Sequence, residues 1–222
     1  MSEQELRRKI VSIGKKAFDY KLLSGTWGNI SARFGKDKML ITPSGFEKVA
    51  LKPSDIVLMD LQGNILRGKW KPSSEVPVHS LIYKAREDVN AVIHTHSHYA
   101  IALAVTGQEI PVLTSEFAAA VGHKVPVTRY AMSGTQEFAK EVVRTLGEGK
   151  AVLLRNHGVI AVGDSLEDAF QTALLVEDEA RTFILASSLG YAKPLDVNEV
   201  KRLRDAYLKS YGQEKRRLSL RF

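Results

Sequence analysis

The chain has 222 residues, a size that suits one domain around one hydrophobic core, and no linker or shift in composition divides it. It contains no cysteine, which excludes disulfides and thiolate metal ligands, and its apolar runs are far too short to span a membrane. The first residues are too polar for a signal peptide, so we expect one cytoplasmic domain, residues 1–222, with no membrane partner.

The net charge of +7 is compatible with binding to nucleic acid, to a membrane surface or to a small anion. Much of this charge lies near the two ends of the chain, where Lys and Arg alternate with acidic and apolar residues in helical patterns. No nucleic-acid motif or basic groove with interleaved aromatic residues accompanies it. We therefore expect a small anionic substrate and no nucleic acid.

The first third of the chain is predicted to be one helix followed by antiparallel strands. Apolar residues at helical spacing predict a helix from Ser2 to Leu22, which ends before the glycine-containing segment 25–29. Alternating or apolar runs separated by turn residues then predict four strands, at 30–34, 39–42, 56–60 and 65–67.

The rest of the chain is predicted to alternate between helices and strands. Helices are expected at 76–85, 99–105, 133–146, 165–188 and 197–211, and strands at 91–96, 125–130, 151–155 and 159–162. Together these elements predict a sheet with largely antiparallel neighbours, covered by helices.

Histidines form the most informative motif. His94 and His96 end an apolar run, and residues two apart on a strand project to the same face, so both can reach one point. His157 also follows an apolar run, although spacing alone does not bring it to the pair. Three histidines with an open fourth position are a common ligand set for catalytic zinc, whereas a single strand-end histidine is more often a surface residue. The other three histidines are expected to be structural or to point away: His79, His98 and His123.

Three segments of small residues, at 25–29, 42–45 and 73–74, are candidates for binding an anion. Hydroxyls, a side-chain amide and backbone N–H groups can surround a phosphate, particularly at the start of a helix. None matches a nucleotide-binding fingerprint, and each alone also fits an ordinary turn. Glu75, at the start of a predicted helix, is either a capping residue or a general base beside a metal.

Five segments in order resemble the class II aldolase family, which includes fuculose-phosphate aldolases and ribulose-phosphate epimerases. They are Gly28-Asn29-Ile30-Ser31, Ile41-Thr42-Pro43-Ser44-Gly45, Lys71-Pro72-Ser73-Ser74-Glu75, His94-Thr95-His96 and Asn156-His157-Gly158. The resemblance runs from about Glu5 to Tyr211. It implies an α/β fold in a single domain, with a three-layer α/β/α arrangement around a mixed, mostly antiparallel sheet. It also implies a homotetramer with active sites at subunit interfaces.

The resemblance further implies a divalent metal, Zn²⁺ or alternatively Mn²⁺ or Co²⁺, on His94, His96 and His157. Glu75 matches the catalytic acid/base of the aldolases, where the epimerases typically have Asp, which favours aldol cleavage. The positions that would bind the substrate phosphate are Thr26, Asn29, Thr42, Ser44, Gly45, Ser73 and Ser74. The expected reaction splits a ketose 1-phosphate, such as L-fuculose 1-phosphate or a related deoxy sugar phosphate, into dihydroxyacetone phosphate and an aldehyde through a metal-bound enediolate.

One departure from the family concerns the proton donor. The tyrosine that donates a proton in fuculose-phosphate aldolases would fall near Ser115, where this chain has Ser115-Glu116-Phe117. Glu116, Tyr207 and Tyr211 are the candidates to replace it. The alternatives within the fold are a sugar-phosphate epimerase and a methylthioribulose-phosphate dehydratase, and those of other classes are a non-catalytic scaffold and a nucleic-acid-binding protein.

Overall fold

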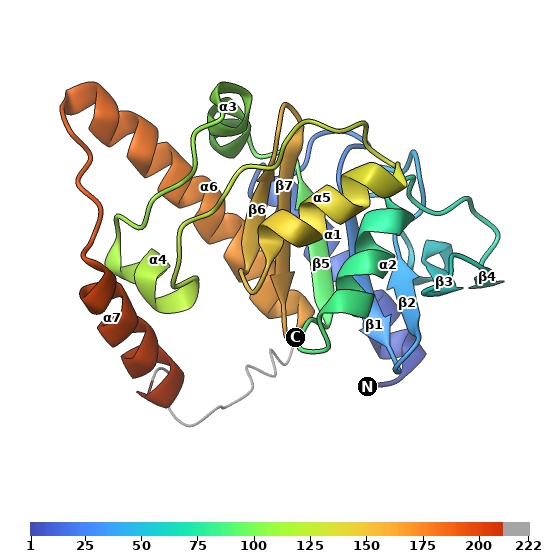
Figure 1. Cartoon of the computed structure of the whole chain (residues 1–222). Helices are drawn as coiled ribbons and strands as arrows, with labels where there is room; N and C mark the ends of the chain where they lie inside the picture. Colours follow the sequence, from blue (N-terminus) through green and yellow to red (C-terminus); the bar gives the residue numbers. More distant parts are fainter. Residues whose placement is uncertain (211–222) are drawn as a thin grey trace.

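The computed structural model describes residues 1–210 (Figure 1). Its strands are β1 (Asn29–Phe34), β2 (Lys38–Ile41), β3 (Val57–Asp60), β4 (Ile65–Arg67), β5 (Ala91–Thr95), β6 (Ala151–Leu154) and β7 (Gly158–Gly163). Its helices are α1 (Glu3–Asp19), the 3₁₀ helix η1 (Pro53–Asp55), α2 (Val76–Ala85), α3 (His98–Thr106), α4 (Ser115–Ala120), α5 (Gln136–Leu146), α6 (Leu166–Leu189) and α7 (Val197–Ser210).

The seven strands form one sheet in the order β4-β3-β2-β1-β5-β7-β6. All neighbouring strands in this order are antiparallel, which confirms the expectation of a mostly antiparallel sheet. Within the sheet β5 lies between β1 and β7, and His94 faces Asn29 on one side and Ile160 on the other. This register places three neighbouring strands around the first of the candidate metal ligands.

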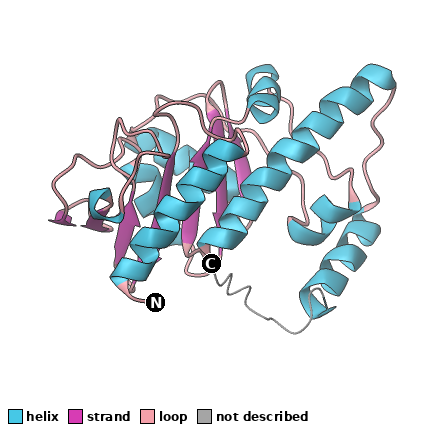
Figure 2. Cartoon of the chain, turned by 180° about the vertical axis from the view of Figure 1, so that it is seen from behind, coloured by secondary structure: helices cyan, strands magenta, loops and turns pink. Residues whose placement is uncertain are grey.

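Helices cover both faces of the sheet, giving the expected three layers (Figures 1 and 2). Ala91 and Ile93 of β5 pack in the same cluster as buried residues of α1 and α6, whereas Val92 packs in the cluster that contains α2 and α5. Because side chains alternate along a strand, His94 shares the face of Val92. His94 therefore points to the side on which Glu75 precedes α2.

A third apolar cluster extends the fold beyond the β6 edge of the sheet. It combines β6 with residues of α3, α4, the second half of α6, and α7 (Figure 1). In the part of the chain that the structure describes, no helix has the length and apolar character needed to cross a membrane.

One prediction about secondary structure is wrong, and one short helix was missed. Residues 125–130 do not form a strand, and only isolated bridges occur there, from Val125 to Ile110 and from Val127 to Leu153. Pro126 has no N–H to donate, which limits a regular ladder at this point. The short helix α4 was not predicted, although Thr114 caps it by accepting a hydrogen bond from the backbone N–H of Phe117.

Candidate metal and active site

The three predicted ligand histidines meet at one point in the structure. The Nε2 atoms of His94 and His96 are 3.0 Å apart, and one nitrogen from each of the three rings lies within 4.8 Å of the others. His94 is the next-to-last residue of β5, His96 follows the end of the strand, and His157 lies in the turn between β6 and β7. Asn156 makes that turn with φ +59°, a left-handed conformation that asparagine tolerates better than most residues. The prediction that these side chains converge is confirmed.

The protonation of the three rings suits metal binding. His94 Nδ1 lies 2.9 Å from the carbonyl oxygen of Val159 and donates its hydrogen there, so Nε2 carries the free lone pair. Burial lowers the pKa of His94 to about 4, that of His96 to about 3 and that of His157 to about 4. All three rings are therefore neutral near pH 7, which is the form that binds a metal.

Glu75 turns its carboxylate into the same space. It occupies the N-cap position of α2, but its side chain makes no capping hydrogen bond, which removes the simplest structural explanation for an acid here. Its Oε2 lies 3.3 Å from Nε2 of His94, and its Oε1 lies 3.7 Å from Nε2 of His157. The side chain is only 7% exposed, and Oε1 has no hydrogen-bond partner.

An unpartnered buried carboxylate oxygen is costly, because it has lost water without gaining another donor. A cation among the three histidine nitrogens would offset that cost and would complete a set of nitrogen and oxygen ligands typical of zinc. The donor set of His94, His96 and His157, with Glu75 facing it, therefore fits a divalent metal.

A chain of buried hydrogen bonds leads away from Glu75. Asn29 Nδ2 donates to Glu75 Oε2 at 2.8 Å, and Asn29 Oδ1 lies 2.5 Å from His79 Nε2. His79 Nδ1 is 2.6 Å from Ser31 Oγ, which is 2.8 Å from the hydroxyl of Tyr83. Because a carboxylate only accepts, the Asn29 amide must point its nitrogen at Glu75 and its oxygen at His79.

This orientation of the Asn29 amide determines which atom donates and which accepts in each of the following hydrogen bonds. His79 Nε2 must donate to Asn29 Oδ1, so Nδ1 must accept from Ser31. Burial lowers the pKa of His79 to about 3, in agreement with a neutral ring, and burial raises the pKa of Tyr83, which stays protonated and donates to Ser31. His79 is buried, and its contact with Asn29 links it to Glu75, which the sequence did not reveal.

The segments expected to bind phosphate lie around this centre. Pro43 and Pro72 form a β-bridge, and the N–H of Ser73 donates to the carbonyl of Thr42, so the segments 42–45 and 71–75 are side by side. The ring of Trp27 lies 5.8 Å from that of His96, which brings the segment 25–28 to the triad. Three of the residues expected to bind phosphate are buried, namely Asn29, Thr42 and Ser73. The other four are exposed: Thr26, Ser44, Gly45 and Ser74.

Two of the buried groups already have partners within the protein. The hydroxyl of Thr42 accepts a hydrogen bond from the N–H of Ile30 at 3.1 Å, and that of Ser73 accepts one from the N–H of Glu75 at 3.2 Å. Both hydroxyls still have a hydrogen to donate. Their contribution to phosphate binding remains a prediction.

Two of the candidate proton donors lie on the helices α4 and α7. Glu116 is exposed on α4, and Tyr207 is half-buried on α7, with the guanidinium of Arg204 5.9 Å from the centre of its ring. The two helices pack against each other beyond the β6 edge (Figure 1). Tyr211 lies outside the described residues. The identity of the proton donor remains a prediction.

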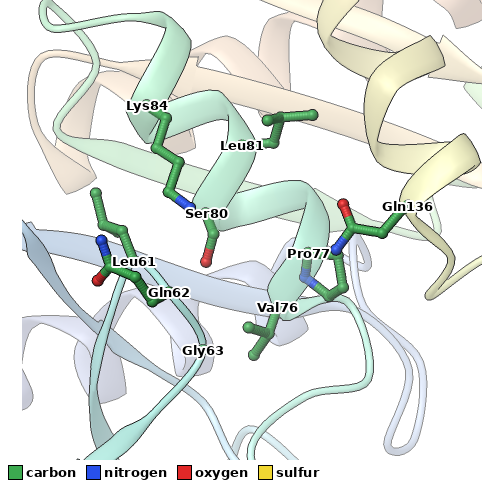
Figure 3. Close-up of a pocket in the computed structure, with 9 residues that line it drawn as sticks. All are labelled: Leu61, Gln62, Gly63, Val76, Pro77, Ser80, Leu81, Lys84 and Gln136. Carbon is green, nitrogen blue, oxygen red and sulfur yellow. The ribbon is translucent and has the colours of Figure 1, made fainter.

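A cavity of about 140 Å³ lies beside α2 (Figure 3). It is lined by Ser80 and Lys84 of α2, by Gln62 in the turn after β3 and by Gln136 at the start of α5. The hydroxyl of Ser80 is buried without a hydrogen-bond partner. None of the predicted site residues lines this cavity, so the candidate active site is the histidine centre.

Comparison with known proteins agrees with this geometry. Residues 8–184 match the model of the class II aldolase and adducin N-terminal domain. The chain belongs to the class II aldolase and adducin family. A 5-deoxy-D-ribulose 1-phosphate aldolase of Bacillus thuringiensis is 38% identical, over 95% of this chain and 99% of that protein. A 5-methylthioribulose-1-phosphate/5-deoxyribulose-1-phosphate aldolase of Rhodospirillum rubrum is 36% identical, over 93% and 92%.

The solved structures include an L-fuculose 1-phosphate aldolase that superposes with a TM-score of 0.89 at 35% identity, over 94% of this chain and 98% of that chain. Family and relatives identify the protein as a class II aldolase, which is a metal-dependent lyase. The resemblance stated from the five sequence segments is thus confirmed at the level of family and fold.

Proposed function

We propose that this class II aldolase cleaves a ketose 1-phosphate reversibly to dihydroxyacetone phosphate and an aldehyde. The observation that carries the proposal is the buried carboxylate of Glu75, whose unpartnered Oε1 faces a triad of neutral histidines. The relatives' names favour L-fuculose 1-phosphate or a 5-deoxy pentulose 1-phosphate as the substrate. The partner of the protein is thus a small sugar phosphate.

The metal that best fits three histidines is zinc, with Mn²⁺ and Co²⁺ as alternatives. Bound by His94, His96 and His157, it would supply Lewis-acid polarisation of the substrate's carbonyl and hydroxyl oxygens. Glu75 moves the proton at the nucleophilic carbon of the dihydroxyacetone phosphate half. Asn29 holds Glu75 Oε2, which leaves Oε1 as the atom that takes and returns this proton. A base positioned in this way typically contributes about 10²–10⁴-fold to the rate.

The phosphate end of the substrate is fixed by Thr26, Asn29, Thr42, Ser44, Gly45, Ser73 and Ser74. Binding there converts the affinity for the phosphate into orientation of the bond to be cleaved. In cleavage the hydroxyl of the departing half loses its proton to Glu116, Tyr207 or Tyr211, and the same group donates that proton to the aldehyde oxygen in the reverse condensation. On the family resemblance we also propose a cytoplasmic homotetramer with active sites between subunits.

The proposal is tested by a screen for retro-aldol cleavage over the 1-phosphates of fuculose, ribulose, rhamnulose, deoxyribulose and methylthioribulose, coupled to detection of dihydroxyacetone phosphate. Release of this product from at least one substrate is the expected result. Conversion of a sugar phosphate without its release would point instead to an epimerase or a dehydratase.

The role of Glu75 is tested separately by Glu75→Gln, which keeps the size of the side chain and one oxygen that can accept from Asn29, but removes its basicity. The variant should keep its metal and lose most of its turnover, by the 10²–10⁴-fold expected of a general base. Wild-type turnover in this variant would refute the assignment.

A further inference from the structure

Lys48 is a buried lysine close to the candidate active site. It is only 1% exposed, although lysine is rarely buried unless it is paired. Its Nζ donates to the carbonyl oxygens of Thr26 at 2.7 Å and Phe46 at 2.9 Å. Within residues 1–210 no carboxylate lies at salt-bridge distance from this ammonium group.

The two carbonyls belong to two different loops of the site. Thr26 lies in the loop between α1 and β1, and Phe46 lies just after Ser44 and Gly45. The second loop is already joined to the segment 71–75, because the N–H of Ser44 donates to the carbonyl of Lys71 at 2.9 Å. Lys48 extends this network to the first loop, so all three expected phosphate-binding segments are tied together.

Lys48 also provides a positive charge close to the loops that are expected to bind the phosphate. The side chains expected to hold the phosphate are all neutral hydroxyls and an amide, whereas a sugar phosphate carries close to two negative charges at pH 7. Burial lowers the pKa of Lys48 to about 8, so the group is still mostly charged at pH 7.

A buried ammonium without an acid partner is unfavourable in the free protein, since desolvation of the charge is not offset by an ion pair. An anion bound between the loops would supply the missing negative charge. We propose that Lys48 is a positioning residue for the substrate phosphate, which holds the loops at Thr26 and Phe46 together and provides the positive potential that binds the phosphate. This inference rests on the proposed function, because that function assigns the loops to phosphate.

The decisive variant is Lys48→Met, which keeps the length and the apolar stem of the side chain and removes its charge. The matched control is Lys52→Met, which changes an exposed lysine four residues further along. Binding of inorganic phosphate to the metal-loaded full chain is measured by calorimetry, together with metal content. Loss of a charge-assisted contact should weaken phosphate binding by about tenfold or more in the Lys48 variant and leave the control and the metal content unchanged.

Steady-state kinetics separate a phosphate role from a general structural one. With a ketose 1-phosphate the Lys48→Met variant should show a KM raised by about tenfold with a smaller change in kcat. Cleavage of the unphosphorylated ketose, measured at high concentration, should stay at the wild-type level. An equal loss with both substrates, or phosphate binding at the wild-type level, would overturn the inference.

Three further outcomes have a definite meaning. If the Met variant fails to fold, Lys48→Gln replaces it, because the amide still has a donor for the carbonyls but no charge; phosphate binding at wild-type strength in that variant would also overturn the inference. If the wild type binds phosphate through Lys48 but cleaves no ketose phosphate, the proposed function fails while the role of Lys48 stands. If the wild type binds no phosphate, the role of Lys48 is refuted.

Discussion

His79→Phe should show how far the activity of Glu75 depends on residues that do not touch the substrate. Phenylalanine has a ring of similar size but no nitrogen, so it removes the contacts at 2.5 Å to Asn29 Oδ1 and at 2.6 Å to Ser31 Oγ. Both partners are buried, Asn29 at 6% exposure and Ser31 at 0%, so water does not replace the lost groups. A buried polar group left unsatisfied costs about 1–3 kcal/mol, or about 2–6 kcal/mol for the two.

That destabilisation is a large share of the roughly 5–15 kcal/mol that stabilises a typical domain. Activity should fall as well, because Asn29 loses the partner that orients its amide toward Glu75. A misplacement of a catalytic group by about 1 Å can cost about 100-fold, so we expect kcat/KM to decrease by about 10- to 100-fold with metal content retained.

The measurements are urea unfolding and kcat/KM of the metal-loaded enzyme. His98→Phe, at an exposed position on α3, is the matched control and should change neither. If His79→Phe unfolds at the same urea concentration as the wild type and keeps its kcat/KM, the chain of hydrogen bonds does not position Glu75 and the reasoning is refuted.

Three other predictions follow from the site. Removal of the metal with a chelator should abolish cleavage, and Zn²⁺, Mn²⁺ or Co²⁺ should restore it; turnover that persists in metal-free protein would contradict the histidine centre. Burial lowers the pKa of His79 to about 3 and that of His94 to about 4, so the unfolded chain binds more protons below pH 6.5. The unfolding free energy of the metal-free protein should therefore fall as the pH is lowered from 6.5 to 5, by up to about 1.4 kcal/mol per pH unit for each residue. Urea unfolding across this pH range measures the change, and an unfolding free energy that stays constant would be inconsistent with buried neutral rings. Gly28→Ala should impair metal binding, measured by metal titration, more than Gly35→Ala. Both glycines have positive φ, but only a Cβ at Gly28 would meet the carbonyl oxygen of His94, at 2.7 Å. Equal effects of the two substitutions would show that this contact is unimportant.

Local pattern in the sequence was sufficient for much of the fold. Alternation and turn residues located all seven strands of the sheet to within one or two residues. The helix expected at 165–188 matches α6, which Ser165 caps by accepting a hydrogen bond from the N–H of Asp168. The pattern misled at 125–130, where an apolar run looks like a strand but Pro126 lacks a donor. It also missed α4, which has only six residues.

The site was predictable to the extent that its residues lie close together in the sequence, as His94 in β5 and His96 just after it do. His94 and His96 are two apart, so their common face followed from the geometry of a strand. His157 is more than sixty residues away, and only the family resemblance brought it to the pair. The links from Glu75 to Asn29 and on to His79 depend on how α2 packs on β1, and the neighbourhood of Lys48 depends on the meeting of two loops. Such contacts leave no periodic signal in the sequence.

The pairing of β5 with β1 and β7 has a practical consequence for changing what this enzyme accepts. Asn29, His94 and Ile160 stand in one row across three hydrogen-bonded strands, so a shift of either pairing by one residue would turn a site residue to the opposite face. The β4 edge and the helices beyond β6 lie outside that row. Libraries that diversify the β4 edge and the helices beyond β6, while leaving intact the three inner strands and the loops that carry the metal and phosphate sites, should therefore retain metal binding more often than libraries that alter those strands.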